Sequence, residues 1–239
     1  MGRPILLHAH PGHELRLFHW MESRRPVVFL LTDGSGGGLP PRTDHSRRCI
    51  AQAGALQRPL PGPCRDAEWY RAILRGDIAP FQAVVAAVTA AATEEGSTLI
   101  ASDAVDGYNP MHDLCEAIAT AVTKRLAGAR HLVSRAVAGD VGTIACEHVL
   151  DAAAIGRKRD AVAAYMPLAE EARRLLDVEE TALRVERLRH PHFTWPEQYT
   201  PEWEETGRAR VASQRYGEAI EYARHVRPIA RALLTGGGA

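Results

Sequence analysis

Four short apolar runs, each followed by a polar or glycine-containing stretch, constrain the fold of this chain more than any other feature. They cover residues 5–10, 27–32, 98–102 and 131–137. Apolar side chains recur at helical spacing in the segments around 13–23, 44–56, 67–74, 81–95 and 112–126. Alternating strands and helices of these lengths predict an α/β fold, a Rossmann-like parallel sheet flanked by helices.

The last third of the chain reads as a helical C-terminal region. The sequence predicts a long charged helix over Arg157–Arg187, interrupted at Pro167, an aromatic loop over 190–201 and an amphipathic helix over 217–234. No internal repeat or long linker divides the 239 residues. We therefore expect a single domain over 1–239, with a core over about 4–165 and the helical region over about 166–235.

Composition narrows the choice of partner and compartment. Lysine and arginine number 29, as do aspartate and glutamate, so no net field favours nucleic acid or an anionic membrane. No apolar run reaches the ~20 residues that cross a bilayer, and the first residues lack the hydrophobic region of a secretion signal. The four cysteines show no C-x-x-C spacing, which predicts reduced thiols in a cytoplasmic protein. A small-molecule substrate is the expected partner, and a homo-oligomer stays open.

Two loops rich in polar side chains follow predicted strands, where ligands bind in open parallel sheets. His10 ends the first strand and His13 follows three residues later, while His112 comes from the second loop, over 103–113. Three imidazoles with one open position form a catalytic zinc site, although other divalent transition metals also accept imidazole. On spacing alone, structural hydrogen bonding stays an alternative, because eleven histidines make some clustering expected.

The same stretches resemble the motifs of the PIG-L/LmbE family of zinc-dependent N-deacetylases. The family's A-H-P-D-D-E stands here as A-H-P-G-H-E over 9–14, and its L-T-D/N-G loop as L-T-D-G-S-G-G over 31–37. Its H-P-D-H stands as N-P-M-H over 109–112, and R-K-R-D-A over 157–161 looks like its K-x-x-A-L helix. The resemblance covers roughly residues 4–165, and its first motif is the most specific.

The resemblance implies a metal ion on His10, His13 and His112, with His13 replacing the family's aspartate ligand. It implies a hydrolase that de-N-acylates an amide on a sugar or small natural-product intermediate by attack of metal-bound water. Gly12 stands where the family has its general base, and glycine cannot move a proton. Asn109 stands where the family has a histidine that stabilises the oxyanion, and its amide can still donate a hydrogen bond.

Other residues are candidates for the missing roles. Carboxylates that could replace the base by loop position are Glu14, Asp103, Asp106 and Asp113, of which Asp106 and Glu14 are preferred. Arg47 or Arg48 could hold a substrate in place of the family's R-x-x-E segment, which is degraded here, and Tyr108 could pack on a substrate ring.

The loss of the base leaves a second function open. The chain could be a catalytically diverged member that binds a sugar-like or acyl ligand, or that uses the metal for non-hydrolytic chemistry. Gly12→Asp should raise hydrolysis if only the base is missing. An interaction protein is a third reading, for which the sequence offers no partner-binding signature.

Overall fold

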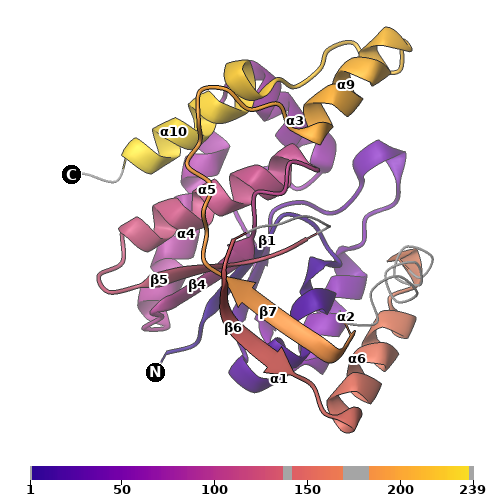
Figure 1. The fold of residues 1–239 in the computed structure, drawn as a ribbon, viewed down its shortest axis with the longest axis vertical. Helices are drawn as coiled ribbons and strands as arrows, with labels where there is room; N and C mark the ends of the chain where they lie inside the picture. The colour runs from indigo at the N-terminus through magenta and orange to yellow at the C-terminus, as the bar shows by residue number, and fades with distance from the viewer. Residues whose placement is uncertain (1, 137–141, 169–182, 237–239) are drawn as a thin grey trace.

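The computed structural model describes residues 2–136, 142–168 and 183–236. Their centre is one seven-stranded sheet in the order β3-β2-β1-β4-β5-β7-β6 (Figure 1). The strands are β1 (Ile5–His8), β2 (Val27–Leu30), β3 (Leu56–Gln57), β4 (Leu99–Asp103), β5 (Arg130–Ser134), β6 (Ile144–Val149) and β7 (Val185–Arg189). The first five in the spatial order are parallel, and β7 and β6 are added antiparallel.

The central strands β1 and β4 are fully buried and mostly apolar, since helices cover both faces of the sheet. Successive side chains of a strand point to opposite faces, so Ile5 and Leu7 enter one apolar cluster and Leu6 enters the other. All four residues of β1 are buried, including the polar His8. Strand β1 therefore lies in the middle of the core. The turn that follows it, with His10 and His13, is attached to a fully buried strand.

Helices divide between the two faces of the sheet. The helical elements are η1 (His13–Leu17), α1 (Phe18–Arg24), η2 (Gly36–Gly38), α2 (Thr43–Gln52), α3 (Asp66–Arg75), α4 (Ala79–Glu94), α5 (Pro110–Lys124), α6 (Ala152–Ala164), η3 (Met166–Leu168), α9 (Glu202–Ala212), η4 (Tyr222–Val226) and α10 (Arg227–Thr235). Side chains of α3, α4, α5 and α10 share the cluster of Ile5 and Leu7. Side chains of α1, α2 and α6 share the cluster of Leu6.

Helix α5 shows why the second polar loop ends where it does. The Asn109 side chain accepts a hydrogen bond from the Met111 backbone N–H at 2.8 Å and so caps the helix, and Pro110 occupies a first-turn position where no backbone donor is needed. Leu114, Ile118 and Val122 bury one face. The cap fixes His112 in the first turn, at the carboxyl edge of the sheet.

The predicted α/β class and the flanking helices are confirmed, while the sheet is mixed: five strands are parallel, as predicted, and β7 and β6 are antiparallel. The predicted helix over Arg157–Arg187 is wrong at its C-terminal end, where β7 joins the sheet, and its middle lies outside the described residues. The helix that is present, α6, begins at Ala152 and ends at Ala164. Strand β7 escapes detection because a charged residue, Glu186, stands on its buried face.

Two further features bear on the C-terminal part. Residues 190–201 form no helix or strand, as predicted, and the last helical segment starts at Tyr222 with a π-turn rather than at residue 217. In the described ranges no single helix is long and apolar enough to cross a membrane, and only the bent pair α3 and α4 meets the length and composition together.

Candidate active site

The three histidines singled out by the sequence lie together at the carboxyl edge of the sheet. His10 follows β1, His13 begins η1 and His112 lies in the first turn of α5. The ring centroids of His10 and His13 are 5.5 Å apart, those of His10 and His112 are 5.1 Å apart, and those of His13 and His112 are 4.7 Å apart. The fold therefore brings a histidine from the second loop against the two that follow the first strand.

Each of these rings has its Nδ1 atom next to an oxygen of a neighbouring side chain. The pairs are His10 with Thr32 at 2.8 Å and Asp66 at 3.2 Å, His13 with Asp103 at 2.7 Å, and His112 with Asp106 at 3.0 Å. Such contacts fix ring orientation and tautomer and leave Nε2 for another partner. The Nε2 atom of His10 is buried and has no hydrogen-bond partner.

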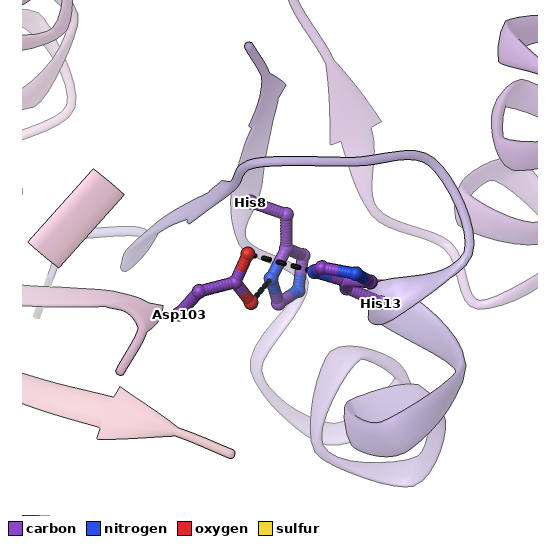
Figure 2. Close-up of side chains that lie close together, drawn as sticks. All are labelled: His8, His13 and Asp103. Atoms are coloured by element: carbon purple, nitrogen blue, oxygen red, sulfur yellow. Dashed lines mark hydrogen bonds and ion pairs between the residues drawn. The ribbon is translucent and has the colours of Figure 1, made fainter. Parts of the chain in front are cut away.

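Asp103 bridges two imidazoles, as Figure 2 shows. One of its oxygens lies 2.7 Å from Nδ1 of His8, and the other lies 2.7 Å from Nδ1 of His13 and accepts the Ala9 backbone N–H at 2.7 Å. Candidate ligand atoms of His8, His13 and Asp103 all lie within 4.8 Å of one another, so this cluster could hold a metal ion. His8 and Asp103 are completely buried.

Burial and charge decide the protonation of these groups. Burial lowers the pKa of His13 to about 3, against the opposing charge and hydrogen bond of Asp103. Burial also lowers the pKa of His112, but the hydrogen bond and charge of Asp106 outweigh it, so the net shift is upward. For Asp103, burial raises the pKa, and the adjacent His13 and His8 then bring it well below its usual range. The cluster thus pairs buried carboxylate with imidazole.

The three histidines open onto a cavity of about 1740 Å³. Its walls come from the turn after β1, the glycine loop around η2, helices α3 and α9, and the segment 215–220. Ligand pockets of ~300–1,000 Å³ already bury a drug-sized molecule. The cavity therefore has room for a substrate considerably larger than an acetamide group.

Gly12 adopts a left-handed backbone conformation with φ of 107°. A Cβ atom added there would overlap a methyl carbon of Leu168 in η3. The position at which the resembled family carries its base therefore has no side chain, and a side chain there would require the Leu168 side chain to move.

The three predicted catalytic residues lie near the histidines but differ in burial and in hydrogen-bond partners. Glu14 is completely buried and accepts the Gly12 backbone N–H at 2.7 Å, and burial raises its pKa. Asp106 faces His112 and accepts the Tyr108 backbone N–H at 2.9 Å. Asn109 lines the cavity and donates from its amide nitrogen to the Tyr70 hydroxyl at 3.1 Å. Glu14 and Asp106 are not among the residues that line the cavity.

The predicted substrate-binding residues separate into two groups. Tyr108 is exposed at the cavity and its ring lies roughly parallel to that of His112, with centroids 6.2 Å apart. Arg47 and Arg48 do not reach the cavity. They lie on the outer face of α2, where Arg47 pairs with Asp44 at 2.9 Å and Arg48 contacts His45 at 2.9 Å. Helical periodicity turns other α2 side chains, such as Ser46 and Cys49, inward.

Sequence reasoning missed two residues at the site. Asp66, at the start of α3, contacts His10, lines the cavity and has a buried Oδ2 atom without a hydrogen-bond partner. Burial raises its pKa, and hydrogen bonds, first of all that with His10, bring it below its usual range. Arg42 lines the cavity beside the turn and donates to the Pro11 carbonyl at 3.3 Å. Nothing local in the sequence marks either residue.

Solved structures share this fold. Residues covering 78% of the chain match 96% of the A40926 pseudoaglycone deacetylase Dbv21 at 16% identity and a TM-score of 0.52. A deacetylase-bog complex of the teicoplanin biosynthesis pathway matches over 77% of this chain and 96% of that one, at 12% identity and a TM-score of 0.50. The conserved protein TT1542 from Thermus thermophilus matches over 83% and 100%, at 13% identity and a TM-score of 0.55.

These similarities confirm, at the level of the fold, the resemblance to PIG-L/LmbE-like deacetylases drawn from the motifs. No family model and no curated protein matches the sequence.

Proposed function

We propose that this protein is a metal-dependent hydrolase that removes an acyl group from an amide nitrogen on a sugar or small natural-product intermediate. The observation that carries this proposal is the arrangement of the rings of His10, His13 and His112. Their Nδ1 atoms face side-chain oxygens, and their centroids lie 4.7–5.5 Å apart at the cavity. The shared fold with two deacetylases supports it.

Three imidazoles are a donor set that zinc accepts. The buried Nε2 atoms of His10 and His8 both lack a hydrogen-bond partner, so each is available as a metal ligand, because a buried polar atom left unpaired costs free energy. We assign the ion to His10, His13 and His112 rather than to His8, His13 and Asp103, because neither His8 nor Asp103 lines the cavity. When bound, zinc would polarise an amide carbonyl and lower the pKa of water in the site.

The residues of the chain supply binding and orientation. Asp103 and Asp106 hold the rings of His13 and His112, and Tyr108 offers an aromatic face at the cavity. The Asn109 amide has two N–H donors and gives one to Tyr70, so the second is assigned to the amide oxygen of the substrate as it gains negative charge.

We assign proton transfer to a carboxylate that takes the place of the base missing at Gly12. The sequence favours Asp106 and Glu14, to which we add Asp66, the one of the three that lines the cavity. We expect Asp66→Asn to lower kcat by about 10²–10⁴-fold when it is measured on metal-loaded protein, since Asp66 also contacts His10. Asp106→Asn should instead weaken metal binding about 10–100-fold through His112. A kcat loss for Glu14→Gln alone, with Asp66→Asn fully active, would transfer the role to Glu14.

Metal content tests the proposal directly. Elemental analysis of the purified protein should find one zinc or another divalent transition metal, and a screen of N-acetylated sugars should release free amine. We expect His10→Ala and His112→Ala to lose both metal and activity, while His45→Ala, on α2 away from the cavity, keeps both. Loss of metal in His8→Ala but not in His112→Ala would place the ion on the buried cluster. Protein that takes up no transition metal would end the proposal.

A second candidate function is favoured by Leu168. Because its methyl group occupies the space of a side chain at position 12, the chain could bind a sugar-like or acyl ligand without hydrolysing it. Tight binding of an N-acetylated sugar by metal-loaded protein, with no amine released over hours, would favour this alternative.

We also propose that the protein is cytoplasmic and that it does not bind nucleic acid. The location is supported by four cysteines that are all unpaired thiols, two of them buried.

A further inference from the structure

The cavity is more basic than the chain that builds it. Seven of its lining residues are arginine or lysine and four are aspartate or glutamate, whereas the whole chain carries 29 of each kind. Pairing occurs on both sides of this balance: Lys158 pairs with the buried Glu186 at 2.7 Å, Asp66 faces His10, and Glu218 pairs with Arg224 at 3.8 Å. The cavity therefore presents an excess of positive charge to whatever enters it.

Five of the arginines at the cavity are in no ion pair of the described residues. Among the described residues, Arg42, Arg65, Arg71, Arg210 and Arg215 form no ion pair with a carboxylate. Elsewhere some arginines are paired, for example Arg58 with Glu94 at 2.6 Å and Arg157 with Glu22 at 2.7 Å, and others in the described ranges, such as Arg75, are not. Arg65 and Arg71 lie near Glu68, whose pKa is lowered by backbone hydrogen bonds from Arg65 and Cys64 and then by the charges of these two arginines. Because none of the five guanidinium groups is in an ion pair within the described ranges, they are available to bind phosphate or carboxylate oxygens of a ligand.

These arginines line the same cavity as the histidines and come from several elements around it. Arg42 lies against Gly34 and beside Pro11, next to the proposed metal site. Asn109 is hydrogen-bonded to Tyr70 of α3, and Arg71 is the next residue of that helix. Across the cavity, α9 carries Arg210, whose guanidinium donates to the Tyr216 hydroxyl at 3.0 Å. Helices α3 and α9 lie in the same part of the molecule (Figure 1).

We propose that the substrate is anionic: a molecule that places its amide at the histidines and a phosphate or carboxylate group between α3 and α9. The identity of the amide rests on the proposed function, whereas the anion site rests on the arginines alone. Arg71 and Arg210 are exposed, so they would bind the anion without a large desolvation cost, and the attraction would weaken with salt.

Binding measurements test this without requiring turnover. Calorimetry with N-acetylglucosamine, N-acetylglucosamine 6-phosphate and N-acetylmuramic acid compares a neutral, a phosphorylated and a carboxylated ligand on the protein as purified. We expect at least about tenfold tighter binding of an anionic sugar at low salt, shrinking severalfold at about 0.3 M salt. A preference for the phosphorylated sugar alone would identify phosphate as the group recognised, and equal preference would identify anionic oxygens in general.

Matched variants locate the effect. Arg71→Gln and Arg210→Gln should each remove most of the preference for the anion, because both side chains are exposed and neither contributes to the core. Arg75→Gln is the control, since Arg75 is exposed on the same helix one turn later and does not line the cavity. Inorganic phosphate should raise the melting temperature of the wild type and of Arg75→Gln more than that of the Arg71→Gln, Arg210→Gln double variant.

Equal binding of neutral and anionic sugars would overturn the inference, as would a preference that survives in the double variant or the absence of any binding by the anionic ligands and phosphate. Protein that prefers anionic sugars but releases no amine would refute the proposed hydrolase and leave the anion site standing. Hydrolysis of neutral and anionic substrates with the same kcat/KM would refute the anion site alone.

Discussion

At the scale of single residues, buried carboxylates organise the site. Asp103 receives contacts from two imidazole rings and one backbone N–H, which uses both of its oxygens. Its pKa is held well below the usual range despite complete burial, because His13 and His8 favour the charged form. A buried charge with this many partners is stable only while all of them are in place.

Replacing Asp103 by asparagine should therefore disturb two histidines at once. An amide offers one acceptor oxygen and one donor nitrogen, so it cannot accept from both rings. We expect metal affinity to fall about 10–100-fold and the free energy of unfolding to fall by about 1–3 kcal/mol. Competition with a chelator and thermal melts measure the two effects. Asp160→Asn, on the exposed side of α6, should change neither, and an unaltered Asp103→Asn protein would contradict the assignment.

Substitution of Gly12 is a second test at the scale of single residues, and it must take account of the neighbouring Leu168. Gly12→Asp alone meets Leu168 and a positive φ, so it should destabilise the protein by at least about 1–2 kcal/mol without a gain in hydrolysis. Gly12→Asp combined with Leu168→Ala frees the space and should recover part of the stability. Leu168→Ala alone is the control. A rise in amine release from the single Gly12→Asp protein would show that Leu168 does not block the position.

At the scale of elements, β7 is tied to two helices by one buried glutamate. Glu186 pairs with Lys158 of α6 at 2.7 Å, and it accepts the backbone N–H groups of His19 and Trp20 in the first turn of α1. Exposure of the Lys158 and Glu186 side chains is 3% and 0%. Glu186 thus interrupts the apolar pattern by which β7 could be predicted, and the same residue fixes β7 against α1 and α6.

Glu186→Gln should destabilise this joint strongly, because it leaves the Lys158 ammonium buried without a counter-charge. Breaking one side of such a pair costs about 3–5 kcal/mol, which denaturant titration would measure. The neighbouring pair of Arg187 with Glu147 is a matched control, since the side chains are 35% and 40% exposed, and Glu147→Gln should cost less than about 1 kcal/mol. Equal losses in the two variants would mean that burial does not set the strength of the Glu186 pair.

At the scale of the whole molecule, buried acids make stability depend on pH. Burial is the main cause that raises the pKa of Glu116 in α5 to about 7, against the hydrogen bond that its carboxylate accepts from Val105 at 2.6 Å. A carboxyl whose pKa is raised by folding binds more protons in the native state. The stability that Glu116 contributes to the folded state is complete below the pKa of about 4.3 that a glutamate has in unfolded chains. This stability is lost as pH rises through about 7.

Glu116→Gln should remove this dependence, because glutamine keeps an acceptor for the Val105 N–H and stays neutral. We expect the variant to gain stability relative to the wild type between pH 5 and 8, by on the order of 1–3 kcal/mol, from chemical denaturation at each pH. Glu94→Gln, at an exposed position, controls for the change of charge. A constant difference between wild type and Glu116→Gln across this range would refute the shift.

The sequence by itself determined the elements that local patterns specify. Apolar runs placed β1, β2, β4 and β5, helical periodicity placed α4 and α5, and the turn after β1 placed His10 and His13 at a sheet edge. These features depend on near neighbours in the chain, so they survive without knowledge of the fold. The resemblance to the deacetylase family used the same short segments.

Only the tertiary structure decided which distant groups meet. Asp66 reaches His10, Leu168 fills the space at Gly12, and Arg71 lines the cavity while Arg47 faces outward. These placements depend on segments that are separated by a helix or more of chain. Their effect on the site comes from burial at the cavity, which residue type alone does not indicate. A charged residue such as Glu186 reads as solvent-exposed in the sequence, since its partner Lys158 comes beside it only when β7 joins the sheet.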